Sequence, residues 1–215
     1  MTRQRIPYVD PATMTDPEMV AEMERCAREG CPRPESQAIR AHAPDIMKTF
    51  AATWDAAFRG GTLDHAIKEL CRIYVSRSVK CEYCGNQRSE KAKSGGTREE
   101  DYKDLLMFEK STRYDARTKA ALAYCDAIVW DQPADDALWA RLHEHFDSRE
   151  LVELGYFVAL TMGQQRWLRT LNIDHHAILP GTTAAMAPGM EDRDALNRAK
   201  SAAGYWARPS RPVAG

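Results

Sequence analysis

The hydrophobic residues of this chain recur at helical spacing, and no segment sustains the two-residue alternation of a β-strand. The clearest series starts at Leu63 and continues through Ile67, Leu70 and Tyr74. Side chains spaced by three or four residues lie on one face of an α-helix, whereas a strand brings every second residue to the same face. We therefore predict an all-α protein built as a helical bundle.

Glycines and capping residues place the expected helix boundaries near the centre of the chain. Gly60-Gly61 ends one helix, and Thr62 is predicted to cap the next. Residues 76–80 carry no apolar stripe, so we expect a turn there and a new helix that begins near Cys81. A long, strongly apolar helix is expected over residues 151–171.

We expect two parts in the chain. Residues 1–176 are predicted to form a helical domain with an N-terminal helical extension. Residues 177–215, rich in Ala, Gly, Pro, Thr and Met, are expected to form a tail that wraps the surface or is partly disordered. Ile67-Lys68-Glu69-Leu70 resembles Leu151-Val152-Glu153-Leu154, which is compatible with a pseudo-duplicated bundle.

Charge and composition argue against several classes of function. The chain has 30 basic and 31 acidic side chains, so neither nucleic acid nor an anionic membrane surface is an expected partner. No apolar run approaches the roughly 20 residues that span a bilayer, and the N-terminal residues do not resemble a secretory signal. The expected location is cytoplasmic. Phosphate-binding glycine motifs are missing from the sequence, so no cofactor is predicted.

Cys81-Glu82-Tyr83-Cys84 is the best candidate for chemistry. A C-x-x-C pair can form a disulfide, and one of its thiols commonly has a depressed pKa, which favours the nucleophilic thiolate. Redox chemistry, a merely structural disulfide and metal binding remain the alternatives. Zinc would need two more ligands at normal spacing, and the sequence offers none, so no metal is predicted. Glu69, twelve residues before Cys81, lies at the border of the apolar helical face.

These features together resemble the carboxymuconolactone decarboxylase superfamily, and within it the alkyl hydroperoxidase D-like branch. The resemblance spans residues 5–173 and implies an all-helical protein that forms homo-oligomers such as dimers, trimers or hexamers. The matching segments, in chain order, are Arg5-Ile6-Pro7-Tyr8-Val9, Arg59-Gly60-Gly61-Thr62-Leu63-Asp64, Glu69 with the Cys81/Cys84 pair, Leu122-Ala123-Tyr124 and Leu151-Val152-Glu153-Leu154.

The resemblance implies an antioxidant peroxidase with a redox-active disulfide and a thiol or dithiol protein as its reductant. Cys84 matches the thiol that attacks peroxide, Cys81 the resolving thiol, and Glu69 the carboxylate of the proton relay. Tyr83 and Arg88 stand where that branch has two relay histidines. Because arginine stays charged, Arg88 is expected to favour the Cys84 thiolate by its charge rather than as a base.

His65, one helical turn before Glu69, is a candidate substitute in the relay, although its position on the helix points away from the buried face.

The leading hypothesis is a thiol-dependent peroxidase. The alternatives are a cofactor-free decarboxylase, isomerase or lyase acting on a small organic acid or lactone, with Arg88 as the carboxylate clamp, and a non-catalytic redox-sensing oligomer.

Overall fold

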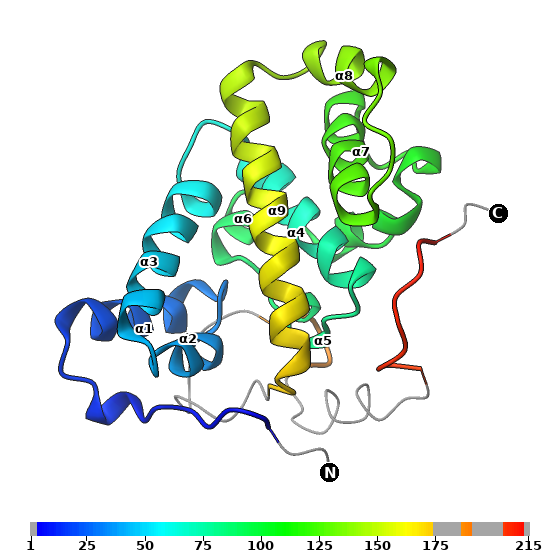
Figure 1. Cartoon of the computed structure of the whole chain (residues 1–215). Helices are drawn as coiled ribbons and strands as arrows, with labels where there is room; N and C mark the ends of the chain where they lie inside the picture. The colour runs from blue at the N-terminus through cyan, green and yellow to red at the C-terminus, as the bar shows by residue number, and fades with distance from the viewer. Residues whose placement is uncertain (1–3, 174–185, 191–203, 213–215) are drawn as a thin grey trace.

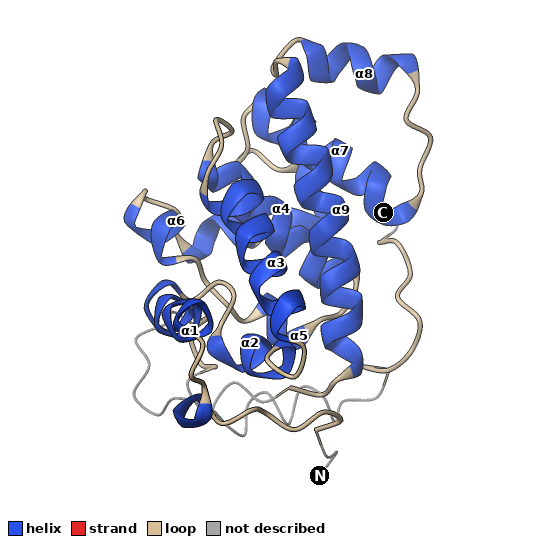
Figure 2. Cartoon of the chain, turned by 60° about the vertical axis from the view of Figure 1, so that its left-hand side comes forward, coloured by secondary structure: helices blue, strands red, loops and turns tan. Residues whose placement is uncertain are grey.

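Helices make up the regular structure in the computed structural model, which describes residues 4–173, 186–190 and 204–212. Figure 2 shows the helices in blue and no strand, and in the described ranges the only β-type pairing is an isolated antiparallel bridge between Gln87 and Met186. The predicted all-α fold is therefore confirmed. No helix in those ranges is both long and apolar enough to cross a membrane. The α-helices are α1 Pro17–Glu29, α2 Pro34–Arg40, α3 Pro44–Trp54, α4 His65–Ser78, α5 Glu82–Gly85, α6 Glu90–Ser94, α7 Ala116–Trp130, α8 Asp136–His143 and α9 Ser148–Thr170.

Helix α4 lies at the centre of the molecule, packed against α7 and against the long helix α9 (Figure 1). The predicted apolar face is buried as expected, since Ile67, Leu70 and Tyr74 all belong to the main core. The burial extends further than the apolar stripe, because Glu69 and Arg72 are also buried. The helix that carries the candidate carboxylate is thus enclosed by its neighbours.

Two predicted helix starts differ from the structure. Asp64, not Thr62, caps α4, because its side chain accepts the backbone N–H of Ala66 at 2.9 Å. The helix expected from Cys81 is only the four residues of α5. The carbonyl of Cys84, which would continue that helix, instead accepts a hydrogen bond from Arg72 at 2.8 Å.

Glu153 of α9 holds the loop that leads into α4. Its carboxylate accepts the backbone N–H groups of Thr62 at 2.9 Å and Leu63 at 3.0 Å, and it lies 3.4 Å from the Lys68 ammonium. Gly61 has a φ of +81°, and a Cβ there would lie 2.3 Å from the carboxylate, so only glycine fits. Glu153 therefore fixes where α4 begins.

We expect Glu153→Gln to lower the free energy of unfolding at pH 7 by about 2–3 kcal/mol. Burial alone would raise the pKa of Glu153, but the hydrogen bonds from Leu63 and Thr62 lower it to about 2. Because the folded-state pKa is depressed, this stability is present above the unfolded pKa and is lost as the pH falls through the folded pKa. Urea denaturation of both proteins between pH 7 and pH 3 should show the difference shrinking below pH 4.5. A pH-independent difference would contradict this role.

The described parts of the C-terminal region contact the helical body. Ala187 donates its N–H to the carbonyl of Asn86 at 2.9 Å, and Arg211 pairs with Asp126 at 2.6 Å. The predicted boundary at residue 176 and much of the predicted tail over 177–215 lie outside the described residues. The division of the chain stays a prediction.

Candidate functional site

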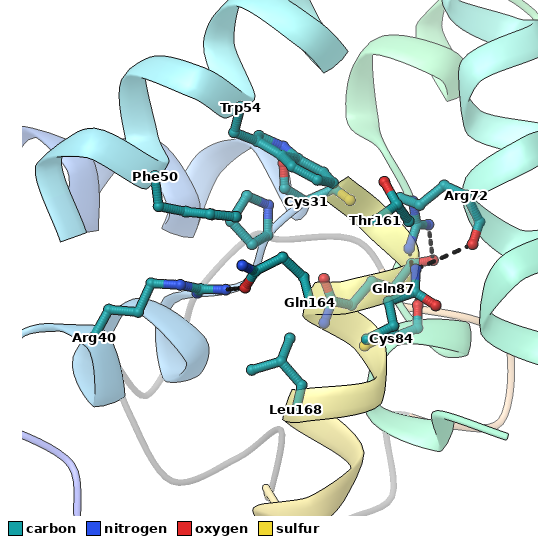
Figure 3. Close-up of a pocket in the computed structure, with 12 residues that line it drawn as sticks. Cys31, Arg40, Phe50, Trp54, Arg72, Cys84, Gln87, Thr161, Gln164 and Leu168 are labelled. Atoms are coloured by element: carbon teal, nitrogen blue, oxygen red, sulfur yellow. Dashed lines mark hydrogen bonds between the residues drawn. The ribbon is translucent and has the colours of Figure 1, made fainter. Parts of the chain in front are cut away.

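A small internal cavity lies between α2, α3, α5 and α9, and the Cys84 thiol forms part of its wall (Figure 3). Its volume is about 30 Å³, in a measure in which one water molecule needs roughly 10–15 Å³. It can therefore hold a molecule the size of one or two waters without rearrangement. Its lining residues are Cys31, Pro32, Arg40, Phe50, Trp54, Arg72, Cys84, Gln87, Thr161, Gln164, Gln165 and Leu168.

Cys84 and Cys81 are both buried and both free thiols. Burial, and next the hydrogen bond with the neighbouring Cys81 thiol, raise the pKa of Cys84 well above its ordinary value, while Arg72 opposes this only in part. The sequence pattern suggested a depressed thiol pKa, and for Cys84 the structure gives the opposite direction. Desolvation dominates because the Cys84 side chain is almost completely buried. The pair is nevertheless close enough for one sulfur to reach the other.

Arg72 of α4 organises the surroundings of the cysteine pair. Its guanidinium binds both oxygens of Glu69, at 2.7 and 2.8 Å, in a buried fork-to-fork pair. It also donates to the backbone carbonyls of Cys84 at 2.8 Å and Gln87 at 2.7 Å. Arg72 thus ties the C-x-x-C loop to the central helix.

Glu69, the predicted relay carboxylate, is fully buried and lies behind Arg72 rather than in the cavity wall. Besides Arg72 it accepts the backbone N–H of Ser89 at 3.1 Å. Glu69 accepts in each of these hydrogen bonds, and the donors belong to Arg72 and Ser89, which hold the loop after Cys84. The structure therefore gives Glu69 a positioning role, and no hydrogen bond among the described residues joins it to Cys84.

Arg88 and Tyr83, which stand at the two histidine positions, both bind groups on other segments of the chain. The Arg88 guanidinium binds Glu99 at 2.6 and 3.0 Å and stacks over the Tyr102 ring. Within the described ranges no hydrogen bond joins it to the sulfur, so charge activation of Cys84 by Arg88 stays a prediction. The Tyr83 hydroxyl accepts the N–H of Ser36 at 3.1 Å, which anchors α2.

His65 reaches Glu69 only through Ser89. Its Nδ1 lies 3.0 Å from the carbonyl oxygen of Phe58, and its Nε2 lies 2.8 Å from the Ser89 hydroxyl. Because a carbonyl can only accept, Nδ1 carries the proton and Nε2 accepts from Ser89. Burial lowers the pKa of His65, which favours this neutral form. His65 does not line the cavity, so its direct participation in a relay at Cys84 has no geometric support.

The sequence reasoning missed Arg72, Arg40, Thr161 and Gln165, which also surround the cavity. Arg72 left a visible signal, since it follows Glu69 by three residues on a helix, a spacing at which opposite charges meet. The other three lie on α2 and α9, far from the C-x-x-C pair in sequence. No short-range pattern marks them.

The described residues contain no group of three or more His, Cys, Asp or Glu side chains that could hold a metal ion. The polar atoms of the cavity come instead from amides, hydroxyls, thiols and guanidiniums. Such a set can bind a small polar molecule next to a thiol.

The deprotonation of Cys84 gives the site a measurable pH dependence. Because burial raises its pKa, only a small fraction is thiolate at neutral pH, and the thiolate is the reactive form. We expect alkylation of Cys84 by iodoacetamide to accelerate by up to about tenfold per pH unit from pH 7 through pH 9. Mass spectrometry of the Cys84 peptide after timed quenching measures this rate. A rate that is already constant below pH 7 would show a depressed pKa instead.

Comparison with known proteins identifies a family segment within the chain. Residues 44–127 match the profile of the carboxymuconolactone decarboxylase family. Two proteins of Mycobacterium tuberculosis are 33% identical over 103 residues, 47% of this chain and 36% of theirs. YdfG of Bacillus subtilis is 25% identical over 52% of this chain and 77% of its own length. The matched part therefore spans about a third of the mycobacterial relatives.

The fold is similar to that of the debrominase Bmp8. A cysteine-to-alanine variant of Bmp8 in complex with 2,3,4-tribromopyrrole has a TM-score of 0.65 and 17% identity, over 81% of this chain and 95% of Bmp8. The apo form of Bmp8 gives a TM-score of 0.62 and 16% identity. At this level of identity the comparison establishes a shared fold.

Proposed function

We propose that this chain, which belongs to the carboxymuconolactone decarboxylase family over residues 44–127, is a thiol-dependent reductase. Cys84 attacks a small electrophilic substrate, with a peroxide as the first candidate, and Cys81 resolves the product. The observation that carries the proposal is the position of Cys84, which lines a small cavity and whose pKa is raised by burial and by the neighbouring Cys81 thiol. A neighbouring second thiol is the requirement for reversible disulfide chemistry.

The proposed reaction has two balanced steps. The Cys84 sulfur attacks the terminal oxygen of a peroxide, the O–O bond breaks, and sulfenic acid and an alcohol or water form. The Cys81 sulfur then displaces hydroxide from the sulfenic acid, which yields a disulfide and water. A thiol or dithiol protein reduces the disulfide by exchange and closes the cycle.

The protons of this cycle come from the thiols themselves. Among the described residues, no Asp, Glu, His or Tyr side chain lines the cavity, so the proposal includes no proton relay of the predicted kind at Cys84. The first step needs none in net terms, because the proton of the Cys84 thiol ends on the leaving oxygen. Catalysis without a relay should be slow at neutral pH and should accelerate with thiolate formation. This agrees with the raised pKa of Cys84.

The fold shared with Bmp8 supports a second candidate, reductive dehalogenation at the same two thiols. In that reaction a carbon–halogen bond is exchanged for a carbon–hydrogen bond while the two thiols become a disulfide, with release of hydrogen halide. The oxidised state of the protein is the same in both candidates. The proposed reductant partner and the homo-oligomer implied by the family stay predictions.

Substrate depletion assays with dithiothreitol as reductant distinguish the candidates. Hydrogen peroxide, tert-butyl hydroperoxide and a bromopyrrole are each followed with and without protein. We expect continuous, protein-dependent loss of at least one peroxide over many equivalents. Loss of bromide from the bromopyrrole alone would favour dehalogenation. Stoichiometric oxidation without turnover would favour the redox-sensing alternative and would refute the proposed enzyme.

A further inference from the structure

Arg40, the last residue of α2, lines the cavity from the side opposite α9 and is only 3% exposed. Its guanidinium donates to three neutral oxygens: the Ser36 carbonyl at 3.1 Å, Gln37 Oε1 at 3.0 Å and Gln164 Oε1 at 2.6 Å. It lies 3.7 Å from the centre of the Phe50 ring. Among residues 4–173, 186–190 and 204–212, no carboxylate forms an ion pair with it.

The absence of a counter-ion distinguishes Arg40 from other buried arginines nearby. Arg25, Arg33 and Arg72 each pair with a carboxylate, at 2.5, 3.4 and 2.7 Å. Burying a charge is costly unless it is paired, and neutral oxygens compensate for it only in part. Burial lowers the pKa of Arg40 to about 10, so it remains a cation at neutral pH. An anion in the cavity would supply the missing partner.

Two other cavity groups also lack partners. Thr161 Oγ1 and Gln165 Oε1 are buried atoms of α9 that find no hydrogen-bond partner among the described residues, although both side chains line the cavity. In Figure 3, Thr161 and Cys84 lie towards the right of the view, and Arg40, bonded to Gln164, lies towards the left. Buried polar atoms are rarely left unpaired, and these two belong to side chains that line the cavity. This observation is independent of the charge of Arg40.

We propose that this cavity is a subsite for small organic anions, carboxylates above all, with Arg40 binding the anionic group. The ligand's carboxylate takes the place of Gln164 on the guanidinium, and its other polar atoms meet Thr161 and Gln165 beside the Cys84 sulfur. The inference rests on the proposed function only in placing the reacting atom at Cys84. The expected substrates are therefore electrophiles that carry a carboxylate or another acid group.

The subsite would be a feature of the N-terminal extension of this chain. Arg40 precedes the family segment, which begins at residue 44. The hydrogen bond between Arg40 and Gln164 thus joins residues of α2 and α9 that are 124 positions apart in the sequence. Gln164 is only half-buried, and the proposal requires its contact with Arg40 to part so that a ligand larger than water can enter.

Alkylation with a charged and a neutral reagent tests the proposal. Iodoacetate and iodoacetamide differ in their acid and amide groups, and both mark Cys84 with a defined mass. We expect the rate of alkylation of Cys84 by iodoacetate, divided by the rate with iodoacetamide, to fall by roughly tenfold or more in Arg40→Gln. This is the scale of one hydrogen bond to a charged group. Arg141→Gln is the control, because Arg141 pairs with Glu109 and does not line the cavity, and its ratio should equal that of the wild type. An unchanged ratio in Arg40→Gln would overturn the proposal.

Gln164→Glu provides a second variant that keeps Arg40 in place. It puts a carboxylate where the amide oxygen now lies 2.6 Å from the guanidinium, so the cation gains an internal partner. We expect the rate of alkylation by iodoacetate, relative to that by iodoacetamide, to fall in this variant as it does in Arg40→Gln, while iodoacetamide still reacts. A wild-type ratio in Gln164→Glu would count against an anion subsite even if Arg40→Gln does not fold.

A binding measurement separates this inference from the proposed function. If neither reagent reaches Cys84 in the folded protein, the nucleophilic role of Cys84 fails, but the subsite can still be assessed by thermal unfolding with acetate or acetamide at equal ionic strength. Stabilisation by acetate alone, lost in Arg40→Gln, would support the subsite. Equal responses to acetate and acetamide in the wild type would refute it.

Discussion

Replacing Cys84 with serine is expected to lower the rate of peroxide reduction by at least about a thousandfold, because a serine hydroxyl supplies almost no nucleophilic anion at neutral pH. Cys84 is the only member of the C-x-x-C pair in the cavity wall. The substitution changes one buried atom, so the fold should persist. Initial rates of peroxide loss, together with the melting temperature of each protein, measure the effect.

Cys81→Ser is the informative companion to Cys84→Ser. Its Cys84 is retained, so the first step should proceed, but the sulfenic acid has no neighbouring thiol to capture it. We expect one equivalent of peroxide to be consumed and the sulfenic acid to be trapped by dimedone at Cys84. Full turnover in Cys84→Ser, or dimedone labelling of Cys81 in that variant, would reverse the proposed roles.

Replacing Arg72 with methionine is expected to lower the free energy of unfolding by about 3–5 kcal/mol, the usual cost of leaving a buried charge without its partner. The substitution strands the Glu69 carboxylate and removes the donors to the carbonyls of Cys84 and Gln87. Many domains have only about 5–15 kcal/mol in total, so this variant should be close to unfolding. Urea denaturation monitored by circular dichroism gives the value.

The double variant Arg72→Met/Glu69→Met separates a positioning role from a relay role for Glu69. Removing both charges eliminates the stranded carboxylate, so we expect part of the lost stability to return. If the double variant also regains peroxide reduction, the Glu69 carboxylate is not needed to move protons. A stability change below about 1 kcal/mol in Arg72→Met would contradict the clamp.

Local patterns in the sequence were sufficient for the central helix. The apolar spacing of Leu63, Ile67, Leu70 and Tyr74 predicted α4, because a buried helical face depends only on residues within a few turns. The relation between Glu69 and Arg72 was also visible as a spacing of three residues. What the spacing could not show is that both side chains are buried and directed at the loop after Cys84.

The cavity itself could not be predicted, since its wall combines helices that are distant in sequence. Arg40 and Gln164 meet only because α2 and α9 are neighbours in the fold. The direction of the Cys84 pKa depends on the same packing, because burial outweighs the C-x-x-C pattern that suggested a depressed value. Arg88 likewise turned to Glu99, a partner that the motif alone did not reveal.

The most direct test of the central claim is a single-turnover experiment with reduced wild-type protein and one equivalent of peroxide, analysed by mass spectrometry of the peptides under non-reducing conditions. The account predicts one disulfide between Cys81 and Cys84 for each peroxide consumed, and its disappearance when dithiothreitol is added. Consumption of peroxide while both thiols remain reduced would contradict it, as would a disulfide that never includes Cys84.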